Sequence, residues 1–598
     1  MIQINEDFLQ DIEEKLLPKG AKFSSQQKNV IKCSETVNII AGPGSGKTTV
    51  LTAKCAMLLN ENISNKKGIC LITHTNVAVD EIKDGLYTLG FEQIEHPHFI
   101  GTIQEFFNYF FARKAFHLLL GDKKMRVLEE DEYRERFDNN FNRLKPENYN
   151  ANNPNPKYKN HKLLINNDLS INVTSDAPNF YKDAFNWSIE RLVNTGILTN
   201  EQCLELAAWY INKYQVKIKN AIKNRFNYVL LDEAQDTNNI QYNLLNQVFL
   251  NNVVFQRFGD PYQALYSIFS NEEDSWMPSN EPLINKLDIS ETSRFNENIA
   301  KYVRGVCVEK YDKFKSISNN NSAPPYFISY ENGDELLSKY RKLINKIKED
   351  CSEFSKSNRK DAILSVKHDD LTGIFDIYKK DKLKIKKSES IIYQMYQSIL
   401  RIISREMDIT IKEADDKVNS SLKIKRKIAT DINAILKPNS EIPIDSLLNI
   451  IENITNSTIA PKRKTELKDR LSKYKLDKTT MYDIKQINTE EFYIGTVHSV
   501  KGETHRSTLL ILNTVFSDFS NTYSYEITEL LENYLLGNYL PLNNIFDSIK
   551  KRETKKALKL AYVAFSRPSH LVAIAIHNNN LNDDLRKSLL EAGWLEGL

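Results

Sequence analysis

The stretch at residues 37–51, VNIIAGPGSGKTTVL, constrains the fold of this 598-residue chain more than any other. A short apolar run leads into a glycine-rich loop, and residues 50–59 then show helical spacing. Glycines allow successive backbone N–H groups to turn inward around a phosphate, and the positive end of the new helix points at the same place. The stretch therefore predicts a nucleotide site, although Ala41 stands where the P-loop pattern has glycine. A chance Gly-Lys-Thr turn is the alternative, which the flanking strand and helix disfavour.

Side chains in and before this loop have predicted roles. Lys47 would reach the β- and γ-phosphates, and the Thr48 hydroxyl would help to hold Mg²⁺. Upstream, FSSQQ at 23–27 opens a helix, with Ser24 or Ser25 as the N-cap. The Gln27 amide donates and accepts, so it suits the edge of adenine, and an ordinary surface glutamine is the alternative. The predicted nucleotide-binding residues are Gln27, Ala41, Gly42, Pro43, Gly44, Ser45, Gly46, Lys47, Thr48 and Thr49.

Strands and helices alternate after the loop. The pattern predicts strands at 68–75 and 98–103, and helices at 77–89 and 104–116. This alternation is typical of a parallel sheet, whose functional side chains gather at the carboxyl ends of the strands. Asn76 and Thr102 lie at those ends, where helix capping is the alternative role for Asn76.

The sheet pattern stops between about 112 and 222 and then returns. Residues 138–180 look like loops and 183–222 look helical, which predicts an insertion between two strands. The strand YVLL at 228–231 ends in Asp232 and Glu233. Asp232 would enter the Mg²⁺ shell, and Glu233 would orient and deprotonate the attacking water. A further strand at 253–258 precedes GDPYQALY.

The order AGPGSGKT, THTN, GT, LLDEAQDTNNIQ and GDPYQALY resembles the first motor domain of UvrD/Rep-type helicases, a branch of helicase superfamily 1. SRF at 293–295, TVHSVKG at 496–502 and LAYVAFSR at 560–567 continue the resemblance. DAILSVKHD at 361–369 resembles the first strand of the second motor domain. The resemblance implies an α/β fold with two RecA-like parallel-sheet motor domains, each with a largely helical insertion.

The resemblance also divides the chain into four parts. Residues 1–111 and 223–290 would form the first motor domain, with 112–222 as its insertion. Residues 291–375 and 490–598 would form the second motor domain, with 376–489 as a basic, reduced insertion.

The second insertion has an excess of basic residues. It has 24 Lys/Arg and 16 Asp/Glu, whereas the whole chain has a net charge of only +3. The basic clusters are KKDKLKIKK at 379–387, KIKRK at 423–427 and KRK at 462–464. Such clusters act on phosphates without reading sequence, so an arm that contacts duplex DNA is one interpretation. A solvated helical surface is the other.

By resemblance the cofactors are ATP and Mg²⁺, with ATP clamped between the two motor domains. Arg294 and Arg567 would neutralise charge on the transferring phosphoryl group from across the cleft, and a plain helix-surface role for Arg567 is the alternative. The implied catalytic residues are Glu233, Lys47, Gln263, Arg294 and Arg567, and the implied metal ligands are Thr48 and Asp232. The residues implied to face single-stranded DNA are Asn76, Thr102, Tyr262, Tyr266, Thr496 and His498.

Three departures from the family pattern stand out. Ser293 replaces the tyrosine that stacks on adenine, so base stacking is weaker or comes from elsewhere. His74 replaces the phenylalanine of T-F-T-N, and THTNVAVD also resembles the oppositely moving branch of superfamily 1. In GETH at 502–505, the ribose-contacting glutamate is displaced by one position.

The rest of the composition narrows the setting. The six cysteines are scattered without a C-x-x-C pair, which argues against a zinc site and suits a reducing cytoplasm. No apolar run approaches the ~20 residues of a membrane span, so we expect a soluble, cytoplasmic protein with no membrane partner.

The leading hypothesis is an ATP-dependent DNA helicase or translocase that moves on single-stranded DNA, 3′-to-5′ by resemblance, and meets duplex junctions. The alternatives are a DNA-activated ATPase that regulates without unwinding, and an RNA helicase. Some helicases of this type with small second insertions pair with a nuclease in bacterial phage defence, for example in Gabija-type systems. The GETH variant is a reason to consider that setting, and DNA repair is the other.

Overall fold

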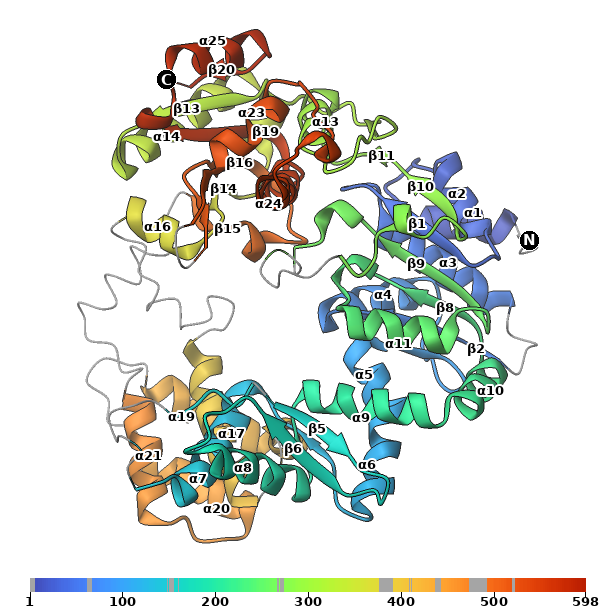
Figure 1. Ribbon diagram of the computed structural model, residues 1–598, viewed down its shortest axis with the longest axis vertical. Helices are drawn as coiled ribbons and strands as arrows, with labels where there is room; N and C mark the ends of the chain where they lie inside the picture. The colour runs from blue at the N-terminus through green and yellow to red at the C-terminus, as the bar shows by residue number, and fades with distance from the viewer. Residues whose placement is uncertain are drawn as a thin grey trace.

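The computed structural model describes residues 6–61, 67–147, 149, 155–159, 161–265, 268, 274–375, 391–407, 409, 411–435, 443–472, 492–518 and 522–597. Figure 1 shows two sheets that lie apart from each other, and a third body made of the inserted segments. Within the described ranges, no helix has both the length and the apolar character needed to cross a membrane.

The first sheet has six strands in the order β10-β1-β9-β8-β2-β3, and all neighbouring pairs are parallel. Side chains alternate along each strand, so Val229 and Leu231 enter one core while Leu230 enters the other. Both faces are therefore buried, which explains the nearly continuous apolar runs. The strands are β1 (Val37–Ala41), β2 (Gly68–Thr73), β3 (Phe99–Thr102), β8 (Phe226–Leu231), β9 (Val254–Gly259) and β10 (Asn285–Ile289).

Helices cover both faces of this sheet. Residues of α1, α2, α3 and α4 pack in one core, and residues of α5, α6, α9 and α11 pack in the other. The helices of the first core are α1 (Glu6–Leu16), α2 (Ser25–Lys32), α3 (Lys47–Glu61) and α4 (Asn76–Thr88). Those of the second core are α5 (Ile103–Phe107), α6 (Arg113–Leu120), α9 (Asn200–Lys213) and α11 (Asn239–Phe249).

The second sheet also has six parallel strands, in the order β15-β14-β16-β19-β13-β20. The prediction that residues 361–369 begin this sheet is wrong, because β13 (Tyr326–Tyr330) precedes β14 (Asp361–Ser365) along the chain. The run YFISY of β13 is apolar and fully buried, but it matches none of the motifs used in the prediction. The other strands are β15 (Tyr493–Thr496), β16 (His505–Ile511), β19 (Pro568–His577) and β20 (Leu595–Glu596).

Helices also pack on both faces of the second sheet, in two separate cores. The two sheets and their helical layers confirm the predicted α/β class with two RecA-like units. The helices of the second unit are α13 (Glu297–Gly305), α14 (Gly333–Asp350), α15 (Ser352–Lys356), α16 (His368–Ile374), α23 (Ile527–Leu535), α24 (Ser548–Phe565) and α25 (Asp583–Glu591).

The first insertion differs in part from its prediction. Helix α7 (Glu130–Leu144) enters the stretch expected to be loops, and β5 (His161–Ile165) and β6 (Ile171–Ser175) form an antiparallel hairpin there. Only alternate hairpin residues such as Leu163 and Val173 are buried, so few apolar positions marked these strands in an Asn- and Lys-rich sequence. The stretch 183–222 is helical as predicted, in α8 (Lys182–Asn194), α9 and α10 (Gln215–Arg225), apart from the short β7 (Ile197–Leu198), which pairs with β4 (Arg126–Val127).

The second insertion is helical in its described part and has its own core. Its helices are α17 (Ile391–Met407), α18 (Ile411–Asn419), α19 (Leu422–Ile435), α20 (Ile444–Thr455) and α21 (Pro461–Ser472). The helices of this set that Figure 1 labels lie in the same body as α7 and α8. Ion pairs join the two insertions, from Arg405 to Glu135 and from Lys124 to Glu413. The cluster at 379–387 lies outside the described residues.

Candidate nucleotide site between the two sheets

The glycine-rich loop joins β1 to α3 at the carboxyl edge of the first sheet. Gly44 and Gly46 have φ angles of 71° and 77°, which favour glycine. A Cβ on Gly44 would also lie 2.5 Å from the Cβ of Arg294 and 2.7 Å from the Thr292 hydroxyl. The loop therefore depends on glycine for its backbone and for the close approach of the chain that leads to the second sheet.

Lys47 is bound by the two acids that follow β8. Its Nζ donates to the Asp232 carboxylate and lies 2.8 Å from Oε1 of Glu233. Burial disfavours the charged form of Lys47, but the two carboxylates outweigh it and hold its pKa above the ordinary value. Burial also opposes ionisation of Glu233, but Lys47 and then Lys501 outweigh it and lower the pKa of Glu233 to about 2. In this arrangement, Glu233 is an ion-pair partner rather than a base.

Glu233 also has an unusual backbone. Its φ of 50° and ψ of 44° are in the left-handed region, which is uncommon for residues other than glycine. Gln235 donates its side-chain amide to the Glu233 carboxylate, and the Asp236 N–H donates to the Glu233 carbonyl at 2.8 Å. Strained backbone that neighbours hold in place is frequent at functional sites, because it aims a side chain. Here it aims a carboxylate at the nucleotide loop.

The predicted metal ligands fit a magnesium ion in their chemistry. Thr48 is the second residue of α3, directly after Lys47. Asp232 follows the last residue of β8 and is 2% exposed. A hydroxyl and a carboxylate supply the oxygen ligands that Mg²⁺ takes together with substrate phosphates. Burial raises the pKa of Asp232 even though the neighbouring Lys47 acts to lower it. A further cation beside this carboxylate would therefore stabilise its charged form.

Arg567 reaches the first sheet from the end of α24. Its Nη2 donates to Oε1 of Gln263 at 2.9 Å, and its Nε donates to the Val563 carbonyl at 3.0 Å. The side-chain amide of Gln263 donates in turn to Asp260 at 2.9 Å. Arg567 is 2% exposed, so it is not a plain surface residue of its helix.

Asp260 links this contact to α24 a second time. Its Oδ2 accepts from the Tyr562 hydroxyl at 3.1 Å, and its backbone N–H donates to Gln235 at 3.1 Å. Burial raises the pKa of Asp260 to about 7. Asp260 therefore connects the acidic loop through its backbone, and Gln263 and the helix of the second unit through its carboxyl group.

Arg294 lies on the crossing from the first unit to the second. Its Nη1 donates to the Ser566 carbonyl at 2.9 Å, next to Arg567, while its Cβ faces Gly44 of the nucleotide loop. Burial and then the nearby Arg567 lower the pKa of Arg294 to about 9. Two arginines thus gather beside the nucleotide loop, where an anionic group would relieve their repulsion.

The Gln27 amide is already occupied in this structure. Its Oε1 accepts from the Ser24 N–H at 2.8 Å, and its Nε2 donates to the Ser45 carbonyl at 2.9 Å. Ser24 is the N-cap of α2, as one of the two predicted options had it. A contact of Gln27 with adenine stays a prediction, and it requires one of these bonds to be exchanged.

The residues predicted to face DNA fall into different environments. Asn76 is exposed, and Thr75 rather than Asn76 caps α4, so the Asn76 amide is not used for capping. Thr102 is 7% exposed and caps α5 through a reciprocal pair with Glu105. Thr496 is buried at the end of β15, and His498 is half-buried in the turn that follows.

Tyr262 differs from its prediction, and Tyr266 lies outside the described residues. The Tyr262 ring is 6% exposed and packs against Tyr311 and Tyr562, with centroid distances of 5.4 and 5.9 Å. Its hydroxyl donates to Glu309 at 3.3 Å. Protein covers the ring, so in this structure Tyr262 joins the two units rather than offering a stacking surface for a base.

Sequence reasoning missed two ion pairs between the units. Lys501 donates to Asp236, and Lys559 donates to Asp274. Lys501 and Asp236 lie in the stretches TVHSVKG and LLDEAQDTNNIQ, but no local pattern indicates that they pair. Asp274 lies in no motif, and sequence gave no signal for it.

Comparison with known proteins supports the resemblance to UvrD/Rep-type helicases. Residues 23–271 match the family model described as the UvrD/REP helicase N-terminal domain. A probable DNA helicase II homolog of Mycoplasma genitalium is 25% identical over 425 residues, which cover 66% of this chain and 59% of that protein. A probable DNA helicase II homolog of Mycoplasma capricolum is 26% identical over 49% of this chain and 42% of that protein.

A third relative is the ATP-dependent DNA helicase PcrA of Staphylococcus aureus. It is 26% identical over 270 residues, which cover 41% of this chain and 34% of PcrA. The chain thus spans less than two thirds of the length of each of these three relatives.

Proposed function

Because the chain belongs to the UvrD/Rep-type helicase family, we propose that the protein is an ATP-dependent motor that moves along single-stranded DNA and separates strands. The observation that carries the proposal is the contact of Arg567 with Gln263 at 2.9 Å, because it brings a cation of the second unit to the nucleotide side of the first. A site divided in this way can couple hydrolysis to relative movement of the two units.

Hydrolysis would begin with a change of partners for Lys47. When the β- and γ-phosphates of ATP enter the loop, the Lys47 ammonium moves from the carboxylates to the phosphates. Mg²⁺, held by Thr48 and Asp232, would neutralise further phosphate charge. Glu233 then loses the larger of the two cationic effects that lower its pKa, so it becomes a better base for the attacking water.

The two arginines would act on the other side of the phosphoryl group. Arg567 and Arg294 are donors without acceptor capacity, and both already lie beside the loop. Their charge would stabilise the negative charge of the transition state, an effect worth about 10³–10⁵ in rate for an arginine supplied in this way.

The DNA path is proposed from the strand ends. Asn76, Thr102, Thr496 and His498 follow carboxyl ends of strands in the two sheets, and Asn76 is the exposed member of this set. Hydroxyl and amide groups of this kind bind phosphates without reading sequence. By resemblance we propose 3′-to-5′ movement.

Matched substrates test the proposal. We expect ATP turnover to rise with single-stranded DNA, and a labelled strand to be released from a DNA duplex with a 3′ overhang but not a 5′ overhang. DNA-stimulated turnover without release would indicate a regulatory ATPase. Release from RNA duplexes alone would indicate an RNA helicase, and turnover that is insensitive to nucleic acid would contradict a translocase.

Arg567 offers a sharper test of the mechanism. We expect Arg567→Ala to lower kcat by about 10³-fold or more with ATP affinity changed only a few-fold, because the arginine acts mainly in the transition state. Arg567→Lys should restore little, since an ammonium lacks the planar fork. Single-turnover hydrolysis and ATP binding measure the two effects, and full rescue by lysine would exclude the proposed role.

We further propose that the protein works in the cytoplasm with a separate nuclease subunit, in phage defence or in DNA repair. The family resemblance supports this setting, and the six free cysteines suit a reducing compartment. Co-purification with the product of a neighbouring nuclease gene would test the partnership, and a protein that protects cells from phage without any such partner would contradict it.

A further inference from the structure

One face of α24 is directed at the first unit. Residues 555, 559 and 562 recur at intervals of four and three, so their side chains lie on the same side of the helix. At the end near Arg567, Tyr562 donates to Asp260 at 3.1 Å. The other end of this face makes a contact that has no part in the nucleotide site described above.

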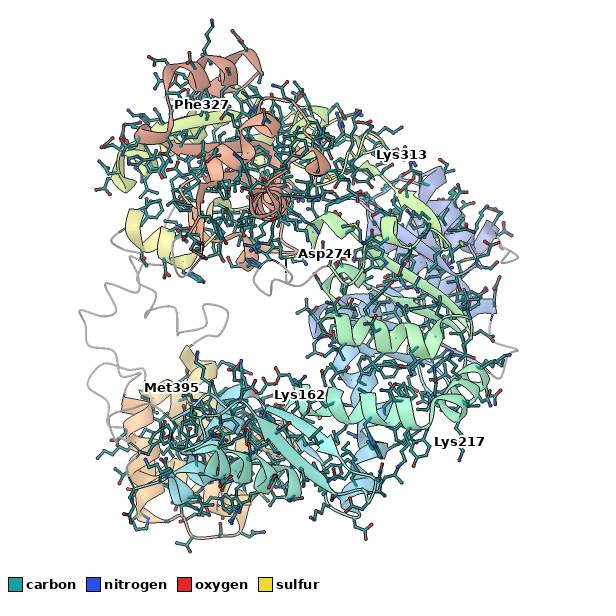
Figure 2. All side chains as sticks on the ribbon, in the orientation of Figure 1. Lys162, Lys217, Asp274, Lys313, Phe327 and Met395 are labelled. Atoms are coloured by element: carbon teal, nitrogen blue, oxygen red, sulfur yellow. The ribbon has the colours of Figure 1, made fainter. Side chains whose placement is uncertain are left out.

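That contact is a buried carboxylate held by two lysines. Lys559 donates to Oδ1 of Asp274, and Lys555 Nζ lies 2.8 Å from Oδ2. The side chains of Asp274 and Lys559 are each 3% exposed, whereas that of Lys555 is 37% exposed. Figure 2 labels Asp274 between α24 and the first sheet.

Electrostatics favour the charged form of this carboxylate. Burial opposes its ionisation, but Lys559 and then Lys555 outweigh that effect and keep the pKa of Asp274 below its ordinary value. An ion pair buried in this way is costly to break from one side, because the remaining charge has no water to replace its partner.

The residues that follow Asp274 are bound to two places in the first unit, the acidic loop and strand β1. The Ser275 hydroxyl donates to the Thr237 carbonyl, which lies in the loop that begins with Asp232 and Glu233. Trp276 is fully buried, and its Nε1 donates to Asn38 of β1 at 3.1 Å. The segment that carries Asp274 is therefore held to the acidic loop and to β1, the strand that leads into the nucleotide loop.

We propose that Asp274, Lys559 and Lys555 form a clamp that positions α24, and through it Arg567, for hydrolysis. Lys559 precedes the end of α24 at Phe565 by six residues, which is about 9 Å along the helix, so it holds the helix without touching the nucleotide. With the contacts of Tyr562 and Arg567, the helix is fixed at two separated places and cannot tilt about one of them. The inference rests on the proposed function, because it assigns a role in that reaction.

Lys559→Met tests the clamp, because it removes the ammonium and keeps a side chain of similar length. We expect the single-turnover rate to fall about 10- to 100-fold, the range that a misplacement of about 1 Å produces, with ATP affinity changed less than threefold. In an Arg567→Ala background, the same change should lower the rate less than twofold, because a positioning residue acts only through the group that it positions. Lys550→Met is the matched control on the same helix, since Lys550 pairs with Glu529 away from this face, and we expect it to keep the full rate.

Three kinetic results would overturn the clamp: an unchanged rate in Lys559→Met, an equal loss in both backgrounds, or an equal loss in Lys550→Met. If Lys559→Met fails to fold, Lys555→Met takes its place, because the Lys555 side chain is partly exposed and its replacement disturbs the core less. We then expect a several-fold loss of rate in the protein that keeps Arg567, and no such loss in the Arg567→Ala background. Hydrogen exchange of residues 555–566 separates this inference from the proposed function. Faster exchange in the lysine variants supports the clamp even in a protein that does not hydrolyse ATP, and unchanged exchange overturns it.

Discussion

The chemistry of the nucleotide site depends on which groups Lys47 binds. It bonds to Asp232 and Glu233 at the same time, and both carboxylates are in the acidic loop after β8. One ammonium therefore neutralises the residue that would hold the metal and the residue that would accept a proton. Nucleotide binding would free both acids in a single movement, which links the base to the presence of its substrate.

Lys47→Ala and Glu233→Gln should both abolish turnover, but for different reasons. Loss of the lysine removes a charge from phosphate binding, so we expect ATP affinity to fall about tenfold or more. Glu233→Gln keeps the shape and removes the base, so ATP should bind normally while hydrolysis falls about 10²- to 10⁴-fold. Nucleotide binding and turnover are measured separately. Near-normal turnover in Glu233→Gln would show that another group deprotonates the water.

At the scale of secondary structure, α19 is the described helix that tests the basic second insertion. Lys423, Lys425 and Arg426 are exposed on it, whereas Lys427 lies 3.4 Å from the buried Asp431 in an ion pair. In the cluster at 462–464, Arg463 and Lys464 pair with Glu406 and Asp445. The unpaired charge density is thus greatest on α19 among the described basic clusters.

Reversing the charge of Lys425 and Arg426 together should weaken duplex binding. If both contact phosphates, the slope of log affinity against log salt should fall by about two, since each contact contributes about 0.9. ATP turnover stimulated by short single strands should persist, because those strands would lie between the motor units. Lys587→Glu on α25 is the control with an exposed lysine outside the insertion. Loss of duplex binding and of single-strand stimulation together would indicate a structural role for the insertion.

Local patterns predicted the parts of the fold that depend on local chemistry. The loop from Gly42 to Thr48, the acids after β8 and the helix cap at Ser24 were readable because backbone geometry and residue type determine each other there. Strands buried on both faces were also visible as apolar runs.

Contacts that form only on folding were not predictable. Tyr262 was expected at a surface because tyrosine suits base stacking, but the aromatic rings of the second unit cover it. Asp274 becomes a buried ion-pair partner only when α24 packs on the first unit. The hairpin β5–β6 was missed because one of its faces is polar, so its apolar residues are few.

At the scale of the whole molecule, two contacts join distant parts of the chain, one between the two motor units and one between the two insertions. The motor units meet through buried polar contacts, whereas the insertions meet through ion pairs with exposed side chains. The Lys124 and Glu413 side chains are 60% and 33% exposed, and those of Arg405 and Glu135 are 21% and 45% exposed. Exposed pairs contribute about 0–1 kcal/mol each and are screened by salt. The two contacts should therefore respond differently to ionic strength.

We expect salt to separate the insertions while the motor units stay together. Raising ionic strength from about 0.05 M to about 0.5 M shortens the screening length several-fold, so the pairs at Arg405 and Lys124 should lose most of their attraction. The radius of gyration from small-angle scattering should then increase. Arg405→Glu should produce the increase at low salt, because it places two acids together, and adding Glu135→Arg should reverse it by restoring an opposite-charge pair. An unchanged radius in Arg405→Glu at low salt would mean that contacts other than these ion pairs hold the insertions together.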